Sequence, residues 1–114
     1  MHELAIAQGI ITAVRGSLTG EQEARVKRIN VTVGEMTALH RDCLEFAFNA
    51  ITTGTSLEGV ELTLEYVKSV FRCKGCGGEF EPEDGFFSPC PDCGGHGVDV
   101  VKGNELFVRS VDLE

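Results

Sequence analysis

Two pairs of cysteines constrain this 114-residue chain more than any other feature of its sequence. Each pair has the form Cys-x2-Cys, and thirteen residues separate Cys76 of the first pair from Cys90 of the second. A short loop of this kind presents two sulfurs to one metal ion, so two loops supply the four thiolates of a tetrahedral Zn²⁺ site. Gly77 and Gly94 follow the loops and permit the positive φ that such a turn favours. The sequence therefore predicts a zinc ribbon with the ligands Cys73, Cys76, Cys90 and Cys93.

Other uses of these cysteines fit the pattern less well. The chain has five cysteines, so pairing them as disulfides leaves one over. A thioredoxin-like redox motif needs only one Cys-x2-Cys. Iron in a rubredoxin-like site is the main competitor for the metal. Because four thiolates leave no open coordination position, we expect a structural site rather than a catalytic one.

Charge and composition restrict the partners and the location of the chain. The formal charge is −8, and four thiolates around one Zn²⁺ would make it more negative, which opposes binding to nucleic-acid phosphates. The segment from Phe71 to Val101 is too rich in glycine to fold without its metal. No apolar run is long enough for a membrane span, and the start Met-His-Glu does not resemble a secretory signal. We therefore expect a cytoplasmic protein with reduced cysteines.

The periodicity of apolar residues predicts a small α+β fold. Helical spacing marks residues 3–18 and about 38–53, and Thr37 is the expected N-cap of the second helix. Alternation of apolar and polar residues predicts three strands, at about residues 25–33, 60–66 and 105–113. We expect the two helices to cover one face of a three-stranded sheet.

The ribbon interrupts this fold and predicts a division into two domains. Residues 1–71 and 103–114 form the predicted α/β domain, and residues 72–102 form an inserted zinc-ribbon domain. The strands on either side of the ribbon are expected to be antiparallel neighbours in the sheet. The fold class is therefore α+β, with two helices on a three-stranded sheet and an inserted zinc ribbon.

The first three residues contain a complete set of nitrogen ligands. The α-amine of Met1, the amide nitrogen of His2 and Nδ1 of the His2 ring form two chelate rings, and the amide of Glu3 supplies a fourth nitrogen. Such a planar set favours Ni²⁺ or Cu²⁺ over Zn²⁺, which prefers tetrahedral sites. The pattern is weak by itself, because a histidine at position two is more commonly a solvated terminal residue.

Longer motifs connect this N-terminus with the cysteines. They are Met1–Gln8, Val31–Glu35, Phe46–Phe48, Gly54–Thr55, Glu58–Leu62, Cys90–Gly94 with His96 just after, and Gly103–Ser110. Through these motifs the chain resembles the HypA/HybF family of hydrogenase and urease nickel-incorporation proteins along its whole length. The zinc loops alone are shared with many families, whereas their combination with the N-terminal motif is much more specific.

The resemblance implies a nickel metallochaperone, not an enzyme, that helps insert Ni(II) into [NiFe] hydrogenase and in some organisms also serves urease. It implies that His2 binds nickel with the backbone nitrogens of Met1, His2 and Glu3, and that the four ribbon cysteines hold structural Zn(II). It also implies a small α/β nickel domain beside the zinc domain. The implied partners are a HypB-type GTPase, the hydrogenase large-subunit precursor and urease maturation proteins. A monomer and a homodimer are both compatible with the sequence.

Three further residues carry potential metal ligands. Cys43 is expected to be a buried small apolar residue, because no second ligand lies at metal spacing. His40 is expected at the surface or as a helix cap, and His96 as a bystander beside four complete cysteines. The alternative function is a zinc-ribbon protein-binding adaptor without a nickel delivery role of its own, in which His2 is incidental.

Overall fold

The computed structural model describes residues 2–83 and 88–114, which form two compact units. The first unit contains the residues up to Thr32, Leu39–Glu65 and Phe107–Glu114. The second contains Val33–Ala38 and Tyr66–Leu106. These units reflect packing alone, so the predicted domains at 1–71 with 103–114 and at 72–102 stay a prediction.

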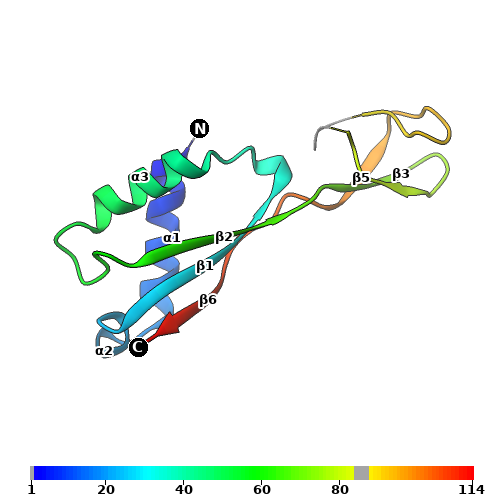
Figure 1. The fold of residues 1–114 in the computed structure, drawn as a ribbon. Helices are drawn as coiled ribbons and strands as arrows, with labels where there is room; N and C mark the ends of the chain where they lie inside the picture. The colour runs from blue at the N-terminus through cyan, green and yellow to red at the C-terminus, as the bar shows by residue number, and fades with distance from the viewer. Residues whose placement is uncertain (1, 84–87) are drawn as a thin grey trace. The chain divides into compact units, whose positions relative to one another are not determined.

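The first unit is built from helices on a sheet. Its helices are α1 (Glu3–Ser17), α2 (Gly20–Glu23) and α3 (Arg41–Thr52). The sheet contains β1 (Val26–Gly34), β2 (Glu61–Val67) and β6 (Leu106–Leu113). Helices α1 and α3 pack against each other and cover one face of this sheet (Figure 1). The predicted α+β class, with two long helices on three strands, is thereby confirmed.

The order of the strands differs from the prediction. It is β2-β1-β6, so β1 separates the two strands that lead into and out of the ribbon, and they are not neighbours. A central strand is paired at both edges and flanked by the side chains of two neighbouring strands, which fits β1, where residues Ile29 to Gly34 are all buried. The apolar alternation identified this strand but did not show that Asn30 and Thr32, on its polar side, would also be buried.

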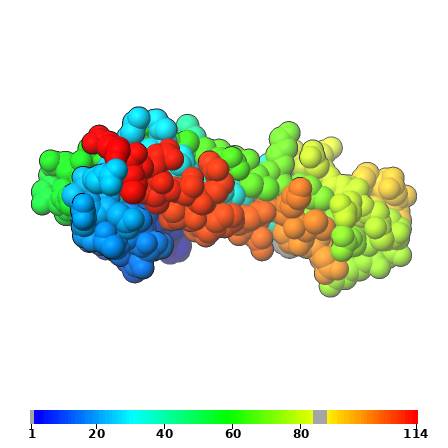
Figure 2. Space-filling view, turned by 90° about the horizontal axis from the view of Figure 1, so that it is seen from below, coloured from blue at the N-terminus to red at the C-terminus, as the bar shows by residue number. Residues whose placement is uncertain are grey.

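The core of the first unit follows the helical periodicity. Helix α1 buries Ala7, Ile10, Ile11 and Val14, and α3 buries Leu44 and Phe48. The helical spacing of Leu4 to Ala7 and Ile11 predicts that Leu4 is buried as well. This prediction is wrong, because 53% of the Leu4 side chain is exposed in the first turn. At the other end of the unit, the Glu114 amide donates to the Arg25 carbonyl at 2.8 Å, and this holds the end of β6 beside the α2 segment (Figure 2).

The start of α3 also differs from the prediction. Thr37 belongs to a short 3-10 turn, η1 (Glu35–Thr37), and its hydroxyl donates to the Gly34 carbonyl at 2.9 Å. Ala38 then has a left-handed φ of 53°, which ends this turn. The N-cap of α3 is His40, whose Nδ1 accepts a hydrogen bond from the Cys43 amide at 3.2 Å. The predicted capping role of His40 is therefore confirmed, and that of Thr37 is wrong.

The second unit contains a small antiparallel sheet. Its strands are β3 (Val70–Cys73), β4 (Glu79–Phe80) and β5 (Val98–Lys102), in the order β4-β3-β5. Phe71 is completely buried and packs edge-on against the Phe80 ring, with 5.9 Å between the ring centroids. Gly34 and Gly103 meet closely in this unit, since a Cβ on Gly34 would lie 2.1 Å from the Gly103 carbonyl oxygen. Among the described residues, no helix is both long and apolar enough to cross a membrane.

Candidate metal sites

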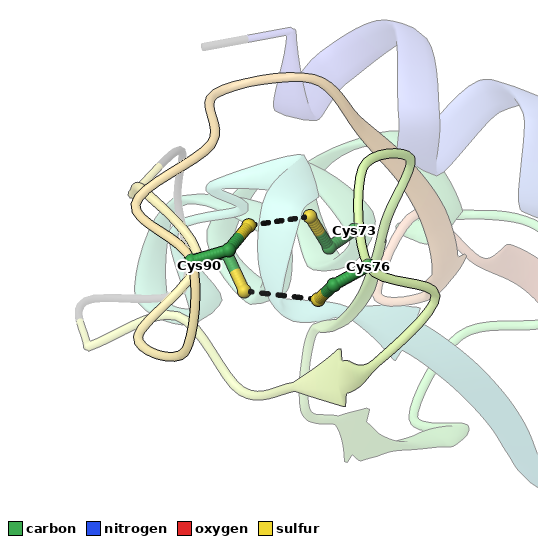
Figure 3. Close-up of side chains that lie close together, drawn as sticks. Cys73, Cys76 and Cys90 are labelled. Atoms are coloured by element: carbon green, nitrogen blue, oxygen red, sulfur yellow. Dashed lines mark hydrogen bonds between the residues drawn. The ribbon is translucent and has the colours of Figure 1, made fainter.

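The four predicted zinc ligands converge in the second unit. The sulfurs of Cys73, Cys76, Cys90 and Cys93 all lie within 4.8 Å of one another. The Sγ atoms of Cys73 and Cys93 are 3.5 Å apart, and those of Cys76 and Cys90 are 3.7 Å apart, so each close pair joins one loop to the other (Figure 3). These distances are far longer than the ~2.05 Å of a disulfide bond.

The two loops have the same backbone design. The Gly77 amide donates to the Cys73 carbonyl at 2.8 Å, and the Gly94 amide donates to the Cys90 carbonyl at 2.8 Å. Both glycines have a positive φ, of 76° and 73°, in the region that side-chain-bearing residues rarely adopt. Each loop thus turns back on itself and brings its two sulfurs to the same side. The role predicted for Gly77 and Gly94 from the sequence is confirmed.

Backbone amides near the sulfurs affect how easily the thiols ionise. The Cys76 amide is the main cause that lowers the pKa of the Cys73 thiol to about 7, followed by the Cys93 sulfur and the Gly75 amide. The Gly95 amide lowers the pKa of Cys93, but the sulfurs of Cys73 and Cys90 outweigh it and raise this pKa to about 11. The loops therefore stabilise a first thiolate, and further thiolates repel it. A bound cation would let all four ionise.

The geometry fits a tetrahedral metal ion. Four sulfurs at about 2.3 Å from one Zn²⁺ are about 3.8 Å from each other in a regular tetrahedron, close to the observed 3.5 and 3.7 Å. Cys73 and Cys90 are buried, whereas Cys76 and Cys93 are exposed. A four-thiolate set suits zinc and also iron, so the site selects a class of metal and leaves no coordination position for a substrate.

The N-terminal residues lie at the start of α1. Met1 is outside the described residues. His2 is exposed and occupies the N-cap position, where its side chain makes no capping hydrogen bond and its carbonyl accepts from the Ile6 amide at 2.9 Å. Glu3 begins the helix and is only 7% exposed. The imidazole of His2 is thereby presented to solvent beside the first amides of a helix.

Glu3 connects the starts of the two long helices. Its Oε2 accepts a hydrogen bond from the backbone amide of His40 at 3.1 Å, so the N-cap of α3 lies beside the first residue of α1. The expected burial of Cys43 is wrong, because this thiol is exposed in the first turn of α3. His96 is also exposed. In the sequence, the spacing His40-x2-Cys43 predicts that these two residues lie on one turn of a helix.

Comparison with known proteins gives one consistent family. The family model described as "Hydrogenase/urease nickel incorporation, metallochaperone, hypA" matches residues 1–113. A hydrogenase maturation factor HypA from Geobacter metallireducens is 39% identical over 114 residues, with all of both chains covered. That of Caldanaerobacter subterraneus is 34% identical over 115 residues, again with both chains fully covered. The chain belongs to the HypA family.

Solved structures support the fold. The solution structure of the Ni metallochaperone HypA from Helicobacter pylori matches with a TM-score of 0.69 at 23% identity, and the match covers 99% of this chain and 97% of that one. At this identity the likeness concerns the fold alone. The family match confirms the resemblance inferred from the sequence and places the chain in the nickel metallochaperone family of hydrogenase and urease maturation.

Proposed function

We propose that this protein captures Ni(II) at its first three residues and delivers it to the hydrogenase large-subunit precursor. The family match from residue 1 to residue 113 carries the proposal. The nickel ligands are the α-amine of Met1, taken as the first residue, the amides of His2 and Glu3, and the His2 imidazole. The exposure of His2 at the N-cap of α1 supports this assignment, because an incoming ion reaches the ring without unfolding the helix.

The position at a helix start suits an amide chelate. The first amides of a helix have no carbonyl acceptor within it, so binding a metal at these nitrogens requires no helical hydrogen bond to break. Two deprotonated amides carry the negative charge that balances Ni²⁺, and the positive end of the helix dipole stabilises this charge. The resulting planar nitrogen set selects Ni²⁺ against the more tetrahedral Zn²⁺.

The four ribbon cysteines hold structural Zn(II) in this proposal. This unit needs the metal because it buries few apolar side chains and its sheet consists of short strands of two to five residues. A closed four-thiolate site performs no chemistry on a substrate. The protein therefore acts as a carrier and not as an enzyme.

The partners follow from the same pathway. The curated relatives are named hydrogenase maturation factors, and the family description includes urease. Our proposal gives this protein a HypB-type GTPase as co-chaperone, the hydrogenase large-subunit precursor as acceptor, and urease maturation proteins as further partners. These proteins meet in the cytoplasm.

The first test is a nickel titration that depends on the chain end. Zinc-loaded protein with its native N-terminus is titrated with Ni²⁺ beside the same protein extended by one residue before Met1, and His2→Ala is the third sample. One tight equivalent that both changes abolish supports the chelate. Equal binding by all three samples would contradict it. Failure of all three to bind would favour the zinc-ribbon adaptor.

A further inference from the structure

A cavity lies between α3 and β2 in the first unit, and none of its lining residues belongs to either proposed metal site. The lining consists of Glu45, Phe48, Asn49, Val60, Glu61 and Leu62. Phe48 and Val60 are buried, whereas Asn49 and Glu61 are exposed, so the cavity has an apolar floor and a polar mouth. Its volume of about 280 Å³ is just below the range of about 300–1,000 Å³ for small-molecule sites, which suits a single long side chain.

The strand beside this cavity has a free edge. Strand β2 pairs with β1 on one side, and no strand among the described residues pairs with its other side (Figure 1). Every second residue of an edge strand keeps its amide and carbonyl available for another chain. Arg41 of α3 donates to the Leu64 carbonyl at 3.5 Å. This bond is longer than the about 2.7–3.2 Å of a normal N–H···O bond, so the amide of an added strand can replace it.

The charges around the cavity favour a basic side chain. Glu61 pairs with Arg28 at 3.0 Å, whereas Glu45 makes no ion pair or hydrogen bond with the described residues. Glu45 is half-buried at the mouth of the cavity, where salt screens its charge less than that of an exposed carboxylate. The formal charge of the whole chain is −8, so a basic segment is also attracted from a distance.

We propose that β2 and the cavity beside α3 form a docking surface for an extended basic segment of a partner protein. The segment adds a strand to the free edge of β2 and places one lysine or arginine side chain in the cavity. The apolar stem of that side chain covers Phe48 and Val60, and its charged end meets the Glu45 carboxylate. The inference goes beyond the proposed function, because it assigns a protein-binding surface that does not depend on nickel.

A second copy of the chain fits this surface less well than a basic partner. Pairing two β2 strands would bring Glu61 and Glu65 of both copies together. Like charges on paired strands destabilise a sheet. The acidic character of β2 thus opposes self-association and selects a segment of opposite charge.

The test uses a designed peptide as the probe and the NMR shifts of backbone amides as the readout. The peptide has seven residues and blocked ends, and it alternates threonine and valine with lysine in place of the central valine. Zinc-loaded protein without nickel is titrated with this peptide and with a version that has glutamate at the centre. We expect the lysine peptide to shift the amides of residues 45–49 and 60–65, and the glutamate peptide to bind at least about tenfold more weakly. Methylation of the peptide's amide nitrogens keeps every side chain but should abolish binding, because it removes the donors to β2.

Two variants of the protein separate the cavity from the general charge. Glu45→Gln should weaken binding of the lysine peptide by at least about fivefold. Glu21→Gln removes the same charge from an exposed position on α2 and should leave the affinity unchanged. Absence of binding, equal affinity for the two peptides, or binding that Glu45→Gln does not weaken would overturn the inference.

Sedimentation of the protein without peptide tests the other occupant. A dimer that Glu45→Gln strengthens would give this surface to a second copy and would also overturn the inference. A monomer that binds the lysine peptide supports it. Because nickel is absent from all these samples, failure of the docking surface leaves the proposed function intact, and the nickel titration tests that function separately.

Discussion

The two proposed metal sites of this protein differ in how their ligands are brought together. The ribbon collects four side chains from two loops that are thirteen residues apart, and antiparallel pairing of β3 with β4 and β5 fixes those loops. The proposed N-terminal site takes its four ligands from three consecutive residues. Three of these ligands are main-chain nitrogens, and the fourth is the imidazole of His2. The first site requires a folded unit, whereas the second requires only the start of a helix.

In the proposed function, this difference explains why zinc stays in the ribbon and nickel can be handed over. Buried Cys73 and Cys90 enclose one side of the ribbon site, and backbone amides already point at its sulfurs. His2 is exposed and its side chain makes no capping bond, so its imidazole is open to solvent. A structural metal is thus held by a preformed cage, and a cargo metal by ligands that an acceptor can reach.

The largest expected effect is the loss of the ribbon metal. Cys93→Ser removes one ligand from the cluster, and a structural Zn²⁺ site contributes about 10–16 kcal/mol of binding free energy that drives folding. Metal analysis should show loss of zinc, and amide exchange should show loss of protection in residues 70–83 and 88–102. Protection that survives zinc loss would mean that the ribbon folds on its own apolar contacts.

The next effect concerns the packing that supports the N-terminal site. Phe48 is 1% exposed and Phe46, two residues earlier on α3, is 78% exposed. Phe48→Ala should lower the free energy of unfolding by about 3–5 kcal/mol, and Phe46→Ala by less than about 0.5 kcal/mol. Chemical denaturation of the zinc-loaded protein measures both. Similar losses for the two variants would show that Phe46 packs against a partner surface, such as a second copy.

The comparison of these two phenylalanines also shows what the sequence could predict. The helical spacing of Leu44, Ala47, Phe48 and Ile51 predicts the buried face of α3 from the sequence. It correctly separates buried Phe48 from exposed Phe46, because the helical period depends only on nearby residues. The clustering of the four cysteines was equally predictable, since the spacing of a metal-binding loop is short and fixed. In both cases a few adjacent residues contain the whole cause.

The features that the sequence could not predict depend on distant segments. The position of β1 between β2 and β6 is a choice among strand pairings that the alternation of each strand allows equally. His40 replaced Thr37 as the N-cap because Ala38 takes a left-handed φ and the Glu3 carboxylate receives the His40 amide, 37 residues away in sequence. Leu4 is exposed although its spacing to Ala7 and Ile11 is helical, because the periodicity of one helix does not show how far its packing partners extend.

A drop in pH should distinguish the two sites, because it should weaken nickel binding and leave zinc in the ribbon. Nickel at the chelate displaces two amide protons and, near neutral pH, most of an amine proton whose pKa is about 8. Its affinity should therefore fall by at least about 100-fold between pH 7.5 and pH 6.5. Isothermal titration at the two pH values measures this, while metal analysis of the same samples should still find one zinc per chain. Equal nickel affinity at both values would exclude deprotonated amides as ligands.

The smallest effect tests the backbone of the ribbon loops. Gly77 has a φ of 76°, and a Cβ at this position would meet no atom within 4 Å, so Gly77→Ala adds backbone strain without a clash. A left-handed residue other than glycine costs about 1–2 kcal/mol. Zinc affinity in competition with a chelator should fall by about tenfold or slightly more. Because Gly75 and Gly78 already lie near cluster sulfurs, they are poorer choices for this substitution.

Gly9 is the matched control for that substitution. It lies in α1, and a Cβ there would also meet nothing within 4 Å. Because its φ is helical, Gly9→Ala should raise the free energy of unfolding by about 0.5–1 kcal/mol and leave zinc affinity unchanged. If both alanines weakened zinc binding equally, the strain of the Gly77 turn would not be the cause. A lower zinc affinity in Gly77→Ala, together with a higher free energy of unfolding in Gly9→Ala, would show that the ribbon depends on the conformation of Gly77. It would also show that α1 tolerates a side chain at position 9.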